Sequence, residues 1–238
     1  MTACGGGGGG VQPTIYPVVS LSTSHASVTE NSGTTVTLTV TASKISDEDI
    51  TVTLSTSGTA TDGTDYSAVN GSSLTISAGL TTATKTFTVT DNSIYEGNET
   101  ATIAISTVSG GSATESGTQS VSITIVENET APTITLATST ASVAENSLAI
   151  GDLPNALFAI IATSSQVTNE DITVTLSTSG SATDGTDYAV ASGSSNNGNG
   201  SLGGQTITIS AGATTGTITG TPTDDSIYED DEVATIAI

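Results

Sequence analysis

The chain has 238 residues, which is enough for two domains of roughly 100–150 residues each. Twenty-four Asp and Glu residues against two Lys give a formal net charge of −22, and the resulting repulsion excludes nucleic acid and anionic lipid surfaces as partners. The single cysteine excludes an intramolecular disulfide framework, and no apolar run reaches the ~18 residues that a membrane-spanning helix needs.

The first thirteen residues are predicted to form a tether, because MTACGGGGGG cannot pack into a core. Ala-Cys followed by glycines resembles the processing site of bacterial lipoproteins, in which Cys4 would carry the lipid. Such a leader normally has a positive segment and an apolar core upstream, and these are missing here. Either the true start of the protein lies further upstream, or this is a chance glycine-rich leader. On the lipoprotein interpretation we expect an extracellular or cell-surface protein whose membrane contact runs only through that lipid.

Short stretches of alternating apolar and polar residues follow from Thr14 onwards. In 35–41, three apolar side chains face one side and the threonines face the other. The same period of two is found in further stretches, with Gly, Asn, Asp and Ser between them and no helical period. These stretches are 50–54, 74–76, 87–89, 103–105 and 121–125. The pattern predicts an all-β chain of immunoglobulin-like antiparallel β-sandwiches.

The chain repeats itself. EDITVTLSTSGTATDGTDY (48–66) recurs with one difference at 170–188, and DNSIYEGNE (91–99) recurs as DDSIYEDDE (224–232). We therefore predict one domain over 14–130 and a second over 131–238, the second stopping before the counterpart of the last strand of the first. Either the chain is a fragment of a longer repeat protein, or a strand from another subunit fills the gap, with residues 14–21 as the candidate donor.

The repeated acidic phrase suggests a cation site. Calcium takes six to eight oxygen ligands, mainly from loop carboxylates and carbonyls, and the absence of nearby His and Cys disfavours zinc. The first copy offers Asp91, Asn92, Glu96 and Glu99 with a carbonyl near Ile94. The second copy offers Asp224, Asp225, Glu229 and Glu232.

The order of motifs resembles the Calx-β domain, a calcium-binding module of sodium–calcium exchangers and of bacterial surface and adhesin-like proteins. The motifs are E-N-S-G, G-T-A-T-D-G-T-D-Y, L-T-I-S-A-G, D-x-S-I-Y-E-x-x-E and I-V-E-N-E, and they cover nearly everything from residue 14 to residue 238. The resemblance implies calcium sites in loops at one tip of each sandwich. The implied ligands are Glu30, Asp65, Asp91, Asn92, the Ile94 carbonyl, Glu96, Glu99, Glu127, Asn128 and Glu129 in the first copy, and Glu145, Asp187, Asp224, Asp225, Glu229 and Glu232 in the second.

Two departures from the family pattern affect the expected sites. Asn92 stands where the family often has an aspartate, which should weaken part of the first site. The second copy lacks the closing acidic run, so its site is expected to be incomplete. An alternative role for Asp65 and Asp187 is that of turn formers, each followed by a tyrosine that caps the core. We expect Tyr95 and Tyr228 to be core anchors.

Catalysis finds little support in the sequence. His25 has no nucleophile near it, and no carboxylate pair suggests a neutral general acid in an apolar cleft. We expect a non-enzymatic, extracellular tandem module that calcium stiffens into a stalk or adhesin segment. Its expected partners are calcium ions, neighbouring repeats or further copies of itself, and a host-surface or matrix protein or glycan. The alternative is a filament subunit completed by donor-strand exchange.

Overall fold

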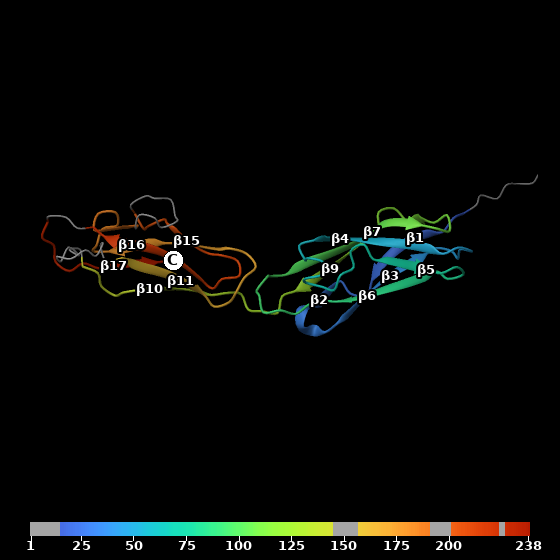
Figure 1. The fold of residues 1–238 in the computed structure, drawn as a ribbon, viewed down its shortest axis with the longest axis horizontal. Helices are drawn as coiled ribbons and strands as arrows, with labels where there is room; N and C mark the ends of the chain where they lie inside the picture. Colours follow the sequence, from blue (N-terminus) through green and yellow to red (C-terminus); the bar gives the residue numbers. More distant parts are fainter. Residues whose placement is uncertain (1–14, 145–156, 191–200, 224–226) are drawn as a thin grey trace, which may run out of the picture. The chain divides into compact units, whose positions relative to one another are not determined.

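A computed structural model describes residues 15–144, 157–190, 201–223 and 227–238. The contacts divide the chain into two units, the first built from residues 1–92 and 98–128 and the second from residues 129–238 together with the short segment 93–97. Each unit is all-β, as predicted (Figure 1). In the part of the chain that the structure describes, no helix has the length and apolarity to cross a membrane. Cys4 and the predicted tether lie outside the described residues.

The first unit contains two sheets that face each other across one core. One sheet has the order β6-β3-β1-β8 and the other β2-β9-β7-β4-β5, with antiparallel pairing except for β1–β8 and β2–β9. The elements are β1 (Val18–Thr23), β2 (Ser27–Thr29), the 3-10 turn η1 (Glu30–Ser32), β3 (Thr35–Ala42), β4 (Ile50–Gly58), β5 (Ser73–Ile76), β6 (Thr82–Thr88), β7 (Glu99–Ser109), β8 (Thr114–Glu115) and β9 (Ser120–Val126).

The alternation of apolar residues explains this core. Val36, Leu38 and Val40 of β3 are fully buried, and Val52 of β4 faces them from the other sheet, while the threonines between them point outwards. Most of the strands predicted from the sequence are confirmed. The stretch expected at 87–89 is the end of the longer strand β6, which stops at Thr88.

The second unit repeats this plan with shorter pairings. Its strands form a sheet of order β10-β11-β16-β14 and two pairs, β12-β15 and β13-β17. The strands are β10 (Ile134–Thr138), β11 (Phe158–Ser164), β12 (Ile172–Thr175), β13 (Ser177–Gly180), β14 (Tyr188–Val190), β15 (Thr206–Ile209), β16 (Thr215–Pro222) and β17 (Ala234–Ala237). Ile160, Leu176 and Ile207 are among the residues that fill its core.

Two sequence-based expectations are wrong. Residues 14–21 are not free to act as a donor strand, because Val18–Thr23 forms β1, which pairs with β3 and buries Val19 and Leu21 in the first core. Tyr228 is no core anchor, since 90% of its surface is exposed. The tyrosine that does reach each core is the one in the G-T-D-Y motif, where Tyr66 packs on Phe87 and Tyr188 packs on Phe158.

Candidate metal sites

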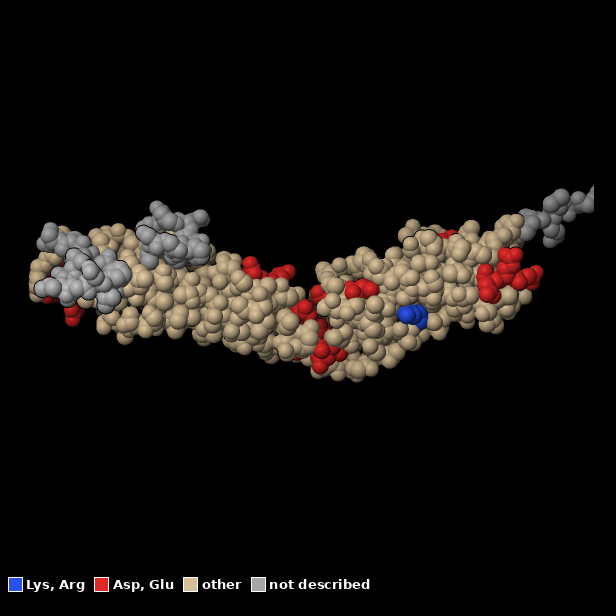
Figure 2. Space-filling model, in the orientation of Figure 1, with Lys and Arg blue, Asp and Glu red and all other residues tan. Residues whose placement is uncertain are grey.

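The acids of the first unit gather at the two ends of its sandwich rather than on the sheet faces (Figure 2). Asp47, Glu48 and Asp49 lie in the loop that follows β3, and Glu30 lies in the turn that precedes it. Since a strand carries its two flanking loops to opposite ends of a sheet, these acids belong to opposite ends. Glu30 therefore marks the end at which the predicted ligands should meet.

Three of the predicted ligands come together at this end. Asp65, Glu96 and Glu99 each offer a carboxylate oxygen, and these three atoms lie within 4.8 Å of one another. Asp65 is 5% exposed and Glu99 is 7% exposed, whereas Glu96 is partly buried. Like charges this close and this far from solvent repel strongly unless a cation lies among them.

The turn that holds Asp65 is built from the G-T-D-Y motif. The Thr61 amide donates to Asp65 Oδ2 at 2.6 Å, and the Thr90 amide donates to the Asp65 carbonyl at 2.8 Å. The next residue, Tyr66, is fully buried, and its burial, followed by the nearby charges of Asp62 and Asp65, raises the pKa of its hydroxyl. The tyrosine thus anchors the turn in the core and leaves Asp65 at its rim. Asp65 is therefore a turn former as well as a member of the acidic group.

A second acidic group is formed by residues of the first repeat copy. Oxygens of Glu30, Glu127 and Glu129 also approach within 4.8 Å of one another. Glu30 is 2% exposed in η1, which ends at Gly33 in the left-handed conformation, with φ of 62°. Glu127 follows β9, and its amide donates to Asn98 Oδ1 at 3.1 Å. This bond ties the closing acidic run to the loop that carries Glu96 and Glu99.

The second unit has one such group among its described residues. Oxygens of Asp187, Glu229 and Glu232 lie within 4.8 Å of one another, but Asp187 is only partly buried and both glutamates are exposed. The turn is the same as in the first unit, because the Thr183 amide donates to Asp187 Oδ2 at 2.5 Å and the Thr223 amide to its carbonyl at 2.9 Å.

The remaining predicted ligands fall into two sets. Asp91 is exposed and belongs to neither acidic group of the first repeat copy. Asn92 and Ile94 are partly buried in the same loop, and Asn128 lies exposed between Glu127 and Glu129. Glu145, Asp224 and Asp225 lie outside the described residues, so their predicted roles stay predictions.

Sequence reasoning missed one aspartate in each copy. Asp62 accepts hydrogen bonds from the amides of Val69 at 2.9 Å and Asn70 at 3.3 Å. Asp184 accepts bonds from the amides of Leu202 at 2.7 Å and Gly203 at 2.5 Å. These carboxylates close the loop that follows each G-T-D-Y turn. The first aspartate of T-D-G-T-D-Y recurs unchanged in both copies, and that signal could have identified it.

The closure in the second copy is the more extensive of the two. Asp184 also accepts bonds from the Ser201 hydroxyl at 2.7 Å and the Thr178 hydroxyl at 3.0 Å. Burial alone would raise the pKa of Asp184, but the four hydrogen bonds outweigh burial and lower it. A Cβ at Gly203 would lie 2.8 Å from the Thr178 hydroxyl and 3.0 Å from this carboxylate, so a larger residue there would displace the hydrogen-bonded groups.

The chemistry of the three groups is that of hard oxygen donors. They contain carboxylates alone, the one histidine, His25, is exposed, and the one cysteine is Cys4. Such donors fit Ca²⁺ or Mg²⁺ and not zinc or copper. The fold and these groups together define a class of protein: tandem immunoglobulin-like β-sandwiches with candidate cation sites in the loops at a sandwich end.

The chain belongs to the Calx-beta domain family. The family model matches twice, over residues 13–130 and 127–238. No curated protein matches the chain in sequence.

Several solved structures are similar in fold. The apo-form Calx CBD1 domain is 22% identical, with a TM-score of 0.39, and covers 47% of this chain and 99% of its own. The CBD12 tandem from CALX1.2 is 18% identical, with a TM-score of 0.42, and covers 86% of this chain and 74% of its own. A two-domain protein of unknown function from Bacteroides fragilis is 10% identical, with a TM-score of 0.36, and covers 88% and 93%.

Proposed function

We propose that this chain is a non-enzymatic calcium-binding tandem module that serves as a stiff stalk or adhesin segment at the cell surface. The observation that carries the proposal is the group of Asp65, Glu96 and Glu99, in which two of three converging carboxylates are buried. Burying carboxylates side by side is unfavourable without a compensating charge, so the group is built for a cation.

The lysines of the chain are poorly placed to supply that charge. Lys44 follows the end of β3 that is roughly 24 Å along the strand from the Glu30 end. Lys85 lies within β6, roughly 13 Å before Val89, the residue that bridges to Tyr66. A divalent ion is the simpler source of positive charge at Asp65.

Calcium fits the donor set better than magnesium. Calcium accepts irregular shells of six to eight oxygens, whereas magnesium demands a regular octahedron and keeps several waters. Loops that present carboxylates from two separate places in the chain suit the irregular shell. When bound, calcium would be held by Asp65, Glu96 and Glu99, with Glu30, Glu127 and Glu129 as a second set in the first repeat copy.

Neutralisation of these acids also explains the proposed stiffness. Glu127 and Glu129 close the last strand of the first domain and lead into residues 130–133 at the start of the second domain. A cation shared between these residues and Glu30 replaces mutual repulsion by coordination and orders the connecting backbone. We expect small-angle scattering to show a narrower range of interdomain distances in calcium than in EDTA.

Calcium titration tests the proposal directly. We expect isothermal titration calorimetry to detect binding, and calcium to raise the melting temperature of the intact chain above its value in EDTA. Glu99→Gln should reduce both effects, whereas Glu48→Gln, which alters an exposed loop at the opposite end, should leave them unchanged. Superimposable melting curves of the wild-type chain in calcium and in EDTA would reject calcium binding.

The surface location rests on separate support. The acidic, single-cysteine composition and the Ala-Cys-Gly tract are compatible with a lipidated surface protein whose target is a host-surface or matrix protein or glycan. Metabolic labelling with a palmitate analogue in a bacterial host should mark the wild-type chain and spare Cys4→Ser. Equal labelling of both proteins would exclude Cys4 as the anchor.

A further inference from the structure

β6 is the longest of the four strands that end the two sheets of the first unit. The end strands are β6, β8, β2 and β5. β6 has 7 residues, whereas β8 has 2, β2 has 3 and β5 has 4. β6 pairs with β3 and with no other described strand, and only at its end does the Ser67 amide donate to the Thr88 carbonyl, at 2.9 Å. The open edge over residues 82–87 is a template on which a strand of another molecule can pair.

Lys85 lies in the middle of this edge and on its core-facing side. In β6 the exposed threonines alternate with Ala83, Lys85 and Phe87, and Phe87 is buried in the core. Lys85 lies opposite Leu38 of β3, which is fully buried, and is itself partly buried. A lysine at such a position lays its alkyl stem along the core and keeps its ammonium group in the water beyond the edge.

The second repeat copy has an isoleucine at this position. The repeat places Ile218 of β16 on Lys85, and the pairing agrees, since Lys85 lies opposite Leu38 of β3 and Ile218 opposite Ile160 of β11. Ile218 is 0% exposed. β16 is not an edge strand, because β14 pairs with residues 220–222 on its other side. The lysine thus stands in the copy whose strand edge is open, and the isoleucine in the copy whose edge has a partner.

The sequence around Lys85 explains why one charge matters there. The chain has two lysines and no arginine, and the stretch 81–90, TTATKTFTVT, contains no charge besides Lys85, no proline and no glycine. Most of its residues are β-branched, so it would pair readily with an identical stretch if no charge interrupted it. The corresponding stretch of the second copy, TTGTITGTPT, lacks the lysine but has two glycines and a proline, which weaken such pairing.

We propose that Lys85 guards the edge of β6 against pairing with a second copy of the chain. A strand added to this edge would cover the core face at Lys85 and enclose its ammonium group, and the burial of an unpaired charge is strongly unfavourable. Two β6 edges related by a twofold axis would bury two such charges in one interface. The lysine therefore lets the first unit keep a long, threonine-rich strand edge in solvent without self-association. This role does not depend on calcium.

Exchanging the lysine for the residue of the other copy tests the proposal. In sedimentation equilibrium of the intact chain, we expect Lys85→Ile to self-associate about tenfold or more tightly than the wild type. High salt screens the repulsion between copies that each carry a net charge of −22. Lys44→Ile makes the same change of charge in the exposed loop after β3 and should behave as the wild type. Lys85→Met, which removes the charge from an unbranched side chain, serves if thermal unfolding shows that Lys85→Ile does not fold.

Moving the lysine along β6 separates a buried charge from net charge. Ala83 lies on the core-facing side of the same edge, and Thr84 lies on the exposed side. Adding Ala83→Lys to Lys85→Ile should restore the wild-type behaviour, because the new charge would again be enclosed by an added strand. Adding Thr84→Lys gives the same net charge on the solvent side, and this double variant should still associate.

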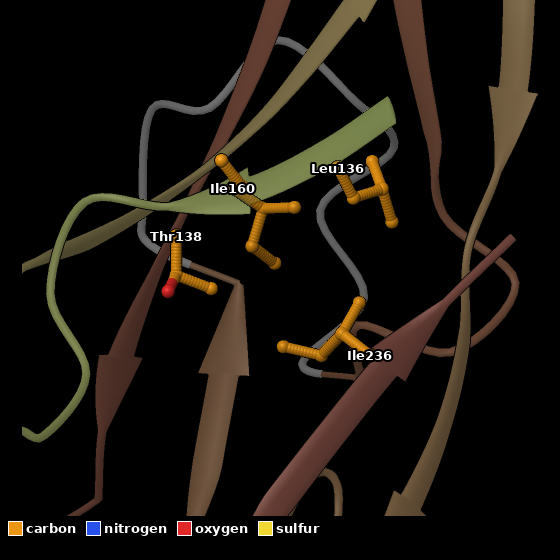
Figure 3. Close-up of a pocket in the computed structure, with 5 residues that line it drawn as sticks. Leu136, Thr138, Ile160 and Ile236 are labelled. Atoms are coloured by element: carbon orange, nitrogen blue, oxygen red, sulfur yellow. The ribbon is translucent and has the colours of Figure 1, made fainter. Parts of the chain in front are cut away.

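An apolar groove of the second unit is a different surface through which two copies could associate. Its volume is about 290 Å³, and Leu136, Ile160 and Ile236 are among the residues around its opening (Figure 3). Adding Leu136→Asp to Lys85→Ile places a charge in this groove. The association should persist in that double variant if it runs through β6.

Three outcomes would overturn the proposal. The first is that folded Lys85→Ile and Lys85→Met chains associate no more than the wild type. The second is that Lys44→Ile associates as strongly as Lys85→Ile, or that Thr84→Lys reverses the association, since either result would assign the effect to net charge. The third is that Leu136→Asp abolishes the association, which would assign it to the groove of the second unit.

Discussion

The two copies of the repeat build the same turn but bury their acids differently. In both, a threonine amide donates to the aspartate of G-T-D-Y, at Asp65 in the first copy and at Asp187 in the second. Yet Glu99 is 7% exposed, whereas its counterpart Glu232 is exposed. The turn follows from local sequence, and the burial of the acids therefore depends on something farther away.

The neighbouring strand accounts for this difference. Glu99 is the first residue of β7 and lies opposite Ile125 of β9. Glu232 precedes β17, which begins only at Ala234 and pairs with β13 alone among the described strands. Of the two nearly identical acidic phrases, the buried one is thus the one whose following strand, β7, also pairs with β9. We therefore expect the more buried acids of the first copy to bind a cation more tightly than the exposed acids of the second.

The largest expected effect concerns the core beside β7 and β17. Ile103→Ala removes a fully buried side chain, so we expect the first unit to lose about 2–5 kcal/mol in free energy of unfolding. Ile236→Ala should cost the second unit only about 1 kcal/mol, because its side chain is only partly buried. Calorimetry of the intact chain measures both losses, because each variant shifts the unfolding transition of the unit that it alters. Equal losses would show that Ile236 is as deeply buried in solution as Ile103.

The next effect concerns calcium. At about a hundred times the dissociation constant, a bound ion adds about 2.7 kcal/mol of stability to the unit that holds it. We expect this gain chiefly in the first unit and its loss in Glu99→Gln. Glu232→Gln should change the second unit by about 1 kcal/mol or less, since exposed charges interact weakly through water. The comparison fails if calcium stabilises the second unit as much as the first.

Much of the fold could be predicted from the sequence. The alternation in 35–41 identified β3 and its inward side chains, and the duplicated motifs identified two sandwiches. Short-range patterns suffice there because a strand in a sandwich has one core face and one solvent face. The convergence of Asp65 with Glu96 and Glu99 was anticipated only through the family resemblance, since no local pattern reports a contact across thirty residues.

What the sequence did not reveal depends on longer-range packing. Tyr228 and Tyr95 occupy the same place in the two acidic phrases, yet Tyr228 is 90% exposed while Tyr95 is partly buried. The prediction of residues 14–21 as a candidate donor strand fails because alternation cannot distinguish an available strand from one already paired, as Val18–Thr23 is with β3. Asp62 and Asp184 were overlooked because an aspartate before glycine suggests a turn and not an acceptor for distant amides.

The smallest effect concerns those two aspartates. Asp184→Asn replaces a carboxylate that accepts bonds from two amides and two hydroxyls by a side-chain amide, whose NH₂ group cannot accept and whose oxygen accepts more weakly. We therefore expect the free energy of unfolding of the second unit to fall by about 2 kcal/mol. Asp62→Asn removes charge from a carboxylate that accepts from two amides, and the first unit should lose about 1 kcal/mol. Equal losses in the two units would show that the extra hydroxyl bonds of Asp184 contribute nothing.

The pH dependence separates the charge of Asp184 from its shape. Because its pKa is lowered in the folded state, the charged carboxylate stabilises the second unit fully above its unfolded pKa of about 3.9. That stabilisation is lost as the pH falls from there through the lower folded pKa. Asp184→Asn removes this titration, so the difference in stability between wild type and variant should shrink below about pH 4. A difference that stays constant down to pH 2 would mean that the loop is closed by the shape of the side chain and not by its charge.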